Sequence, residues 1–291
     1  MSDSGLGCPD WPLCHGQIIP PLELTTLIEY SHRLSATALG VLVLATAVMA
    51  WRTCCDDLRA IVSSTMALAL VVVAAVLGGI TVWVELAWWV VLLHLGIAEF
   101  VVACIVVAAA AGWKVRQAPR ADAAGDSAYG WFDLLVAGSV VSVFALILLG
   151  SYMVGKGYGS ACDTWPLCGG SLLPEGSAAL VHMAHRFVTA LIGVLVAATV
   201  IAAWTRRAQS PRLLWASLLA AALLVAQSLV GAATVWTGFA APLKSIHLSV
   251  ATLLWVAIVF VATVQFLPHR LAASNAAHNP GRVSRLERLE P

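Results

Sequence analysis

Seven long apolar stretches limit most strongly how this chain can fold. Each is long enough to cross roughly 30 Å of hydrocarbon as a helix. They cover residues 27–51, 60–83, 88–112, 131–153, 179–204, 213–236 and 243–267. Of the 291 residues, 11% are charged, whereas about a quarter are charged in an ordinary globular domain. The sequence therefore predicts an all-α, polytopic membrane protein with seven transmembrane helices.

Basic residues are concentrated in alternate loops, which the positive-inside rule assigns to the cytoplasm. The opposite segments, residues 1–26, 84–87, 154–178 and 237–242, contain one basic residue, Lys156. The C-terminus is then cytoplasmic, and for residues 268–291 we expect a tail of little structure because no apolar period continues there. A net charge of +1 gives no reason to expect a nucleic acid partner.

A seven-residue cysteine loop occurs twice in the sequence. "CPDWPLC" at residues 8–14 returns as "CDTWPLC" at 162–168. With an offset of 153 to 154 residues, His32 matches His185, His94 matches His247, and "TVW" at 81–83 matches 234–236. Such a fixed period is the mark of a duplicated unit. We therefore expect two tandem, pseudo-symmetric helical bundles, over residues 1–120 and 121–267.

The second bundle has a helix, 131–153, before its cysteine loop. The counterpart of this helix would lie upstream of Met1. We therefore expect eight helices in total, with Met1 as an internal methionine or the chain truncated.

Four repeated histidines lie at one depth in the predicted spans, roughly 6 to 11 Å below the outer boundary. They are His32, His94, His185 and His247. An ionisable residue inside the membrane is a functional candidate. Two histidines per half do not complete a tetrahedral zinc site, but they match the axial ligands of a haem in a four-helix bundle. We predict one haem iron between each pair; the alternative is hydrogen bonding between helices.

The two bundles differ three residues before the first histidine of each pair. Glu29 stands there in the first bundle and His182 in the second. Beside a haem, a buried carboxylate acts as acid, base or stabiliser of positive charge; the alternative is a solvated interfacial charge. Arg33 and Arg186 each follow a histidine, either as haem propionate partners or as arginines that reach out to the interface.

Each outward loop contains two cysteines six residues apart, Cys8 with Cys14 and Cys162 with Cys168. Disulfides persist in that compartment, so we expect each pair to close a small ring. The ring is either a structural staple or a redox-active dithiol. The sequence leaves both readings open.

Several of these segments resemble the haem A synthase family over residues 4–267. The motifs are "SGLGCPDWPLCHGQ" followed by "EYSHR", and "CDTWPLC" followed by "HMAHR", with His94 and His247 in later helices. The resemblance implies eight spans in two four-helix halves of a cell membrane protein. It also implies that haem O is oxidised at its C8 methyl group to a formyl group.

The same resemblance implies roles for the two halves. The half with Glu29, His32 and His94 would hold haem O, and Glu29 would stabilise a cationic intermediate or handle its proton. The half with His185 and His247 would hold haem b as a cofactor. Haem O synthase is the implied partner, while the electron acceptor, the oxygen source and the oligomeric state stay open.

Two other functions remain consistent with parts of the sequence. One is a di-haem electron carrier of the membrane cytochrome b kind, although such carriers usually have haems at both leaflets. The other is an outward-facing thiol–disulfide relay, which would leave the four histidines unexplained.

Overall fold

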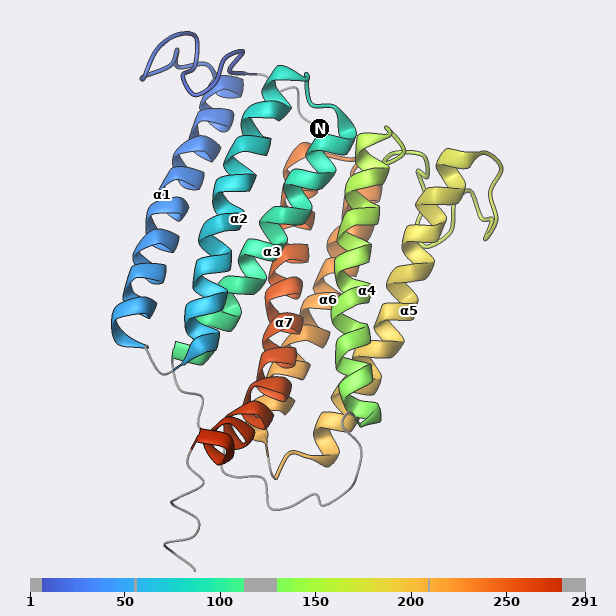
Figure 1. The fold of residues 1–291 in the computed structure, drawn as a ribbon. Coiled ribbons are helices and arrows are strands. Elements are labelled where there is room, and N and C mark those ends of the chain that lie inside the picture. Colours follow the sequence, from blue (N-terminus) through green and yellow to red (C-terminus); the bar gives the residue numbers. More distant parts are fainter. Residues whose placement is uncertain (1–6, 55–56, 113–129, 209, 279–291) are drawn as a thin grey trace, which may run out of the picture.

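The computed structural model describes residues 7–54, 57–112, 130–208 and 210–278, and Figure 1 shows how their long helices are arranged. The helices are α1 (Leu24–Thr53), α2 (Leu58–Trp83), α3 (Trp88–Gly112), α4 (Trp131–Gly155), α5 (Ser177–Thr205), α6 (Pro211–Trp236) and α7 (Ala241–His278). All seven are long and apolar enough to span a membrane. The predicted all-α membrane fold is confirmed.

The C-terminal end of α7 differs from the prediction. The helix continues to His278, although the sequence predicted little structure from residue 268 onward. The segment "RLAASNAA" contains several good helix formers, and extending an existing helix requires no new nucleus. The rest of the predicted tail, 279–291, lies outside the described residues.

The second half is a closed ring of four helices. Helix α4 packs on α5, α5 on α6, α6 on α7, and α7 again on α4. Buried aliphatic side chains from all four helices form its core, among them Val143, Ile192, Leu224 and Ile258. Helices α5 and α7 are therefore diagonal to each other, so side chains on their inner faces point toward one shared interior.

The first half is an open row rather than a ring. Helix α1 packs on α2, and α2 packs on α3. Helix α3 also contacts α4 and α7 and so joins the two halves, while α1 lies at one edge (Figure 1). No helix among the described residues takes the place that α4 has in the second half. The expected eighth helix, upstream of Met1, and the expected boundary near residue 120 lie outside the described residues.

Both cysteine loops lie at the same end of the molecule, before α1 and before α5 (Figure 1). Each contains a disulfide, Cys8–Cys14 in the first loop and Cys162–Cys168 in the second. Of the other described cysteines, Cys54 and Cys104 are free.

Candidate haem-binding sites

The four histidines occupy matching positions on their helices. His32 and His185 are each the ninth residue of α1 and α5, and His94 and His247 are each the seventh residue of α3 and α7. The histidines of each half therefore lie at one depth below the cysteine loops.

In the second half, both imidazoles pack against a glycine of a neighbouring helix. A Cβ added at Gly231 would lie 3.1 Å from Cε1 of His247, and one added at Gly150 would lie 3.4 Å from Cε1 of His185. Because glycine has no side chain, the two imidazole rings have room beside these helices. The Nδ1 atoms of both histidines are buried without a hydrogen-bond partner, and Nε2 of His247 lies 3.2 Å from Nε2 of Gln227.

In the first half, one of the two imidazoles is held in the same way. Gly78 of α2 lies against His94, with 3.4 Å from an added Cβ to Cε1, and Gly78 is the repeat counterpart of Gly231. His32 is exposed. The reason is local: His185 is covered by α4 through Gly150, and the described helices include no equivalent cover for His32.

The donor set fits a haem better than a metal ion held by protein ligands alone. Among the described residues, no group of three or more His, Cys, Asp or Glu side chains could hold a metal ion. The second half instead offers two imidazoles from diagonal helices around a shared interior, and the first half offers two from α1 and α3, a ligand pair that suits a haem. The unpartnered Nδ1 atoms of His94, His185 and His247 and the glycines beside them agree with a site built for a larger group.

Glu29 connects α1 to the first cysteine loop. Its Oε2 accepts the backbone N–H of Cys8 at 3.0 Å, and its Oε1 forms an ion pair with Arg33 one helical turn later. The residue is 9% exposed. The carboxylate is therefore buried and paired at the cysteine-loop end of the site.

Arg33 holds the same loop through main-chain oxygens. Its Nη1 donates to the carbonyls of Asp10 at 2.8 Å and Leu13 at 2.6 Å. Nη1 thus binds the loop. Pairing of this guanidinium with a haem propionate stays a prediction.

The second half has the same kind of contact between helix and cysteine loop, but with a different side chain. Nδ1 of His182 accepts the backbone N–H of Cys162 at 3.3 Å, and its Nε2 lies 3.4 Å from Nη2 of Arg186. Arg186 donates through Nη1 to the carbonyl of Pro166 at 2.9 Å. An imidazole thus stands where the first half has a carboxylate.

Each loop also rests on the next helix of its half. Trp11 lies against Gly79 of α2, with 3.0 Å from an added Cβ to Cδ2, and meets Trp83 edge-on at 6.3 Å. In the second half, Trp165 meets Trp236 edge-on at 5.7 Å. The loops therefore link α1 to α2 and α5 to α6 above the histidines.

The turn after the first tryptophan is held by Asp10. Its carboxylate accepts the backbone N–H groups of Gly16 at 2.7 Å and His15 at 2.6 Å. These hydrogen bonds, that of Gly16 foremost, hold the pKa of Asp10 below its ordinary value. Thr164 takes this place in the second loop, where its Oγ1 accepts from Gly169 at 2.7 Å.

The glycines beside the histidines and the acid Glu99 were not predicted from the sequence. Gly78 and Gly231 are separated by the same repeat offset as the histidines, so the repeat could have identified them. Glu99 is 2% exposed in the middle of α3. Its repeat counterpart is Thr252. A carboxylate that lies within a span and occurs in one repeat only could also have been identified from the sequence.

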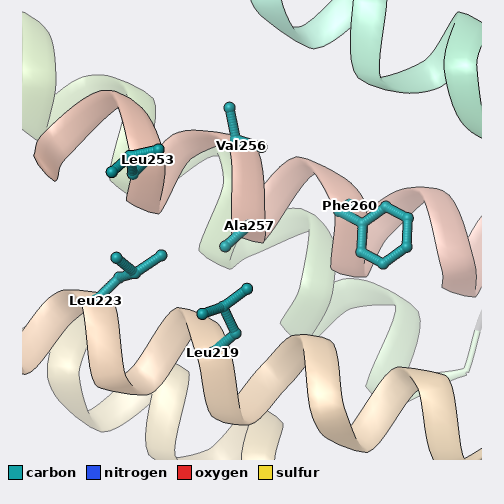
Figure 2. A pocket seen from close by; sticks show the side chains of 6 residues that line it. All are labelled: Leu219, Leu223, Leu253, Val256, Ala257 and Phe260. Carbon is teal, nitrogen blue, oxygen red and sulfur yellow. The ribbon is translucent and has the colours of Figure 1, made fainter. Parts of the chain in front are cut away.

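A separate cavity lies between α6 and α7 (Figure 2). Its volume is about 310 Å³, and Leu219 and Leu253 are exposed at its surface. The lining residues are Leu219, Leu223, Leu253, Val256, Ala257 and Phe260. All are apolar, so the cavity provides no ligand or acid for chemistry.

Comparisons with known proteins agree with these features. The family model described as cytochrome oxidase assembly protein, COX15-CtaA, matches residues 22–259 and also 176–287. The haem A synthase of Halalkalibacterium halodurans is 27% identical over 268 residues, which cover 90% of this chain and 88% of that protein. The haem A synthase of Geobacillus kaustophilus is 26% identical over 284 residues, with 97% and 89% covered.

Proposed function

The chain belongs to the COX15-CtaA family of cytochrome oxidase assembly proteins, and we propose from this membership how its two halves carry out the reaction of a haem A synthase. The enzyme is an oxidoreductase that converts haem O to haem A in the membrane. The C8 methyl group of haem O becomes a formyl group through successive hydroxylation and loss of water. The supplier of haem O is a haem O synthase in the same membrane.

The second half is the cofactor half. His185 and His247 would hold the iron of haem b, which would supply electron transfer there. Diagonal placement on α5 and α7 supports the assignment, since both imidazoles reach the interior of a closed ring. Gly150 and Gly231 keep that interior open beside the rings.

The first half is the substrate half, with haem O between His32 and His94. The observation that carries this assignment is the asymmetry of the loop anchors, because Glu29 has a carboxylate where His182 has an imidazole. A fixed negative charge at the outer end of a water-poor site stabilises positive charge that develops on the substrate. Glu29 supplies that charge, and Arg33 holds it in place.

The protein lies in the plasma membrane with both cysteine loops outside and the C-terminus in the cytoplasm. This orientation follows from the basic residues of the opposite loops. The disulfide loops cover the outer ends of the two sites, where Arg33 and Arg186 would pair with haem propionates.

Haem extraction tests the assignment directly. Membranes that contain the wild-type chain and a source of haem O should yield haem A on chromatography. Glu29→Ala should keep bound haem and yield no haem A, and His185→Ala should lose the haem b signal in the reduced-minus-oxidised spectrum. Normal haem A from Glu29→Ala would overturn the role of Glu29.

The same measurements separate the rival functions. A di-haem electron carrier would show both haem signals and form no haem A from haem O. A thiol relay would keep its activity in His185→Ala and lose it in Cys8→Ser. Formation of haem A that depends on His185 fits only the synthase.

A further inference from the structure

Glu99 is a buried acid that the haem sites do not use. It is the twelfth residue of α3 and so lies near the middle of the span, roughly 17 Å from its outer end. Its Oε1 accepts the hydroxyl of Thr252 at 2.7 Å, and its backbone carbonyl accepts the indole N–H of Trp255 at 2.8 Å. Its Oε2 is buried and has no hydrogen-bond partner.

The two partners come from repeat-related positions in the two halves. Glu99 and Thr252 are separated by the repeat offset of 153 residues, and each is the twelfth residue of its helix. Helices α3 and α7, which also match in the repeat, pack on one another. Such self-paired contacts are expected where two copies meet about an approximate two-fold axis. Glu99 therefore lies at the junction of the halves.

No basic side chain in the described ranges forms an ion pair with Glu99. The nearest ionisable groups along the helices are five residues away, roughly 7.5 Å: His94 and Cys104 on α3, and His247, which is five residues from Thr252 on α7. Lys244 is farther out on α7. Arg59, at the start of α2, is close to the opposite end of the bundle.

The ionisable residues of α4 are also distant from Glu99. Asp133 accepts from Gln265, which is thirteen residues, or roughly 20 Å, from Thr252 along α7. Tyr152 packs on Trp88, which is eleven residues, or roughly 17 Å, from Glu99 along α3. Among the residues that the structure describes, none therefore brings to the junction a positive charge that would balance an ionised carboxylate.

An unpaired charge in such a place is strongly unfavourable, and the group becomes neutral instead by taking up a proton. The hydrogen bonds agree with the neutral form, since Oε1 accepts as a carbonyl oxygen and Oε2 is left to carry the hydrogen. We propose that Glu99 is a proton-binding site at the junction of the two halves, a carboxylic acid at neutral pH that Thr252 positions. This inference rests on the packing of α3 and α7, and not on the proposed enzymatic activity.

Infrared spectroscopy of the full chain in lipid nanodiscs at neutral pH tests the proposal. A protonated carboxyl group absorbs apart from ionised carboxylates, and its band shifts in D₂O. We expect this band in the wild type and its complete loss in Glu99→Gln. A wild-type spectrum identical to that of Glu99→Gln in this region would overturn the proposal.

Two further variants identify the source of the band. Thr252→Val should keep the band and move it to higher frequency, because the carbonyl oxygen loses a hydrogen bond. Glu29→Gln should leave it unchanged, since Glu29 is paired with Arg33. Loss of the band in Glu29→Gln would assign the proton to Glu29 and overturn the proposal.

The stability of the variants gives a second readout. Glu99→Gln matches a neutral acid in shape and polarity, so it should keep the monodisperse elution and the melting temperature of the wild type. A strong loss of melting temperature in Glu99→Gln, together with an unchanged carboxyl band, would show that Glu99 acts as an anion and would contradict the inference.

Discussion

Glu29 and His182 stand at equivalent positions of the two halves and accept the same hydrogen bond. Each accepts a hydrogen bond from the backbone N–H of the first cysteine of its loop, at 3.0 Å for Glu29 and 3.3 Å for His182. Each also lies beside the arginine one turn later. The loop anchor can therefore be built from an acid or from an imidazole, and the choice of the acid in one half needs a separate reason.

Replacing Glu29 by histidine tests whether the first half needs the negative charge of a carboxylate at this position. Glu29→His should keep the first loop anchored, because His182 does this in the second half, and should keep bound haem. Haem A should fall below detection, because the imidazole cannot supply a negative charge. Haem extraction with chromatography is the measurement. Substantial haem A from Glu29→His would mean that Glu29 serves only to anchor the loop.

Adding a methyl group beside a proposed haem ligand should impair haem binding. In Gly231→Ala, the new Cβ would lie 3.1 Å from Cε1 of His247, closer than the 3.4 Å expected in Gly78→Ala and Gly150→Ala. The imidazole must move, so the haem content per protein should fall most in Gly231→Ala. Haem quantification by absorbance measures this effect.

Gly193→Ala provides the matched control, since no atom lies within 4 Å of its added Cβ. This variant should keep its haem and stabilise α5 by about 0.5–1 kcal/mol, because alanine is the better helix former. Equal haem content in Gly231→Ala and Gly193→Ala would contradict the role of Gly231.

Acid should loosen the first cysteine loop before the second. The pKa of Asp10 is lowered in the folded protein, so its stabilising effect is present above the ordinary aspartate pKa of about 3.9 and is lost as the pH falls through the lower folded value. Reduction of Cys8–Cys14 by an acid-active phosphine should then speed up below about pH 4, as mass spectrometry can follow.

The second loop is the internal control for this effect, since Thr164 does not titrate and holds the equivalent turn. Asp10→Asn should show fast reduction of Cys8–Cys14 already at neutral pH. Parallel acceleration of both disulfides in acid would exclude Asp10 as the cause.

Gly79→Ala should displace Trp11 from α2. The added Cβ would lie 3.0 Å from Cδ2 of the indole, a contact that forces the ring to shift, and overpacking of this kind costs about 1–3 kcal/mol. We expect faster reduction of Cys8–Cys14 at neutral pH, with Gly138→Ala unchanged because its Cβ would meet no atom within 4 Å. Unchanged reduction in Gly79→Ala would show that Trp11 does not hold the loop.

The sequence predicted the helices well because hydropathy is a local property and a span has a minimum length. Apart from the C-terminal end of α7, each predicted helix boundary lies within three residues of the observed one. The matching positions of His94 and His247 also followed from the repeat, since equal spacing along equivalent helices gives equal depth.

Contacts between distant segments were not predictable in the same way. The hydrogen bonds from Arg33 to the carbonyls of Asp10 and Leu13 depend on how the loop folds back over α1, and no periodic pattern encodes that path. The exposure of His32 depends on which helices surround α1. The contact of Glu99 with Thr252 required knowing that α3 packs on α7.

The contact between Glu99 and Thr252 also bears on why both halves belong to one chain. In a homodimer of identical halves, each residue on the axis would meet its own copy. Two glutamates would then face each other across a dry junction, each without the hydroxyl that positions Glu99, and two threonines would offer no acid. A single polypeptide with two unequal halves can place one acid opposite one hydroxyl, which no symmetric pair of subunits can do.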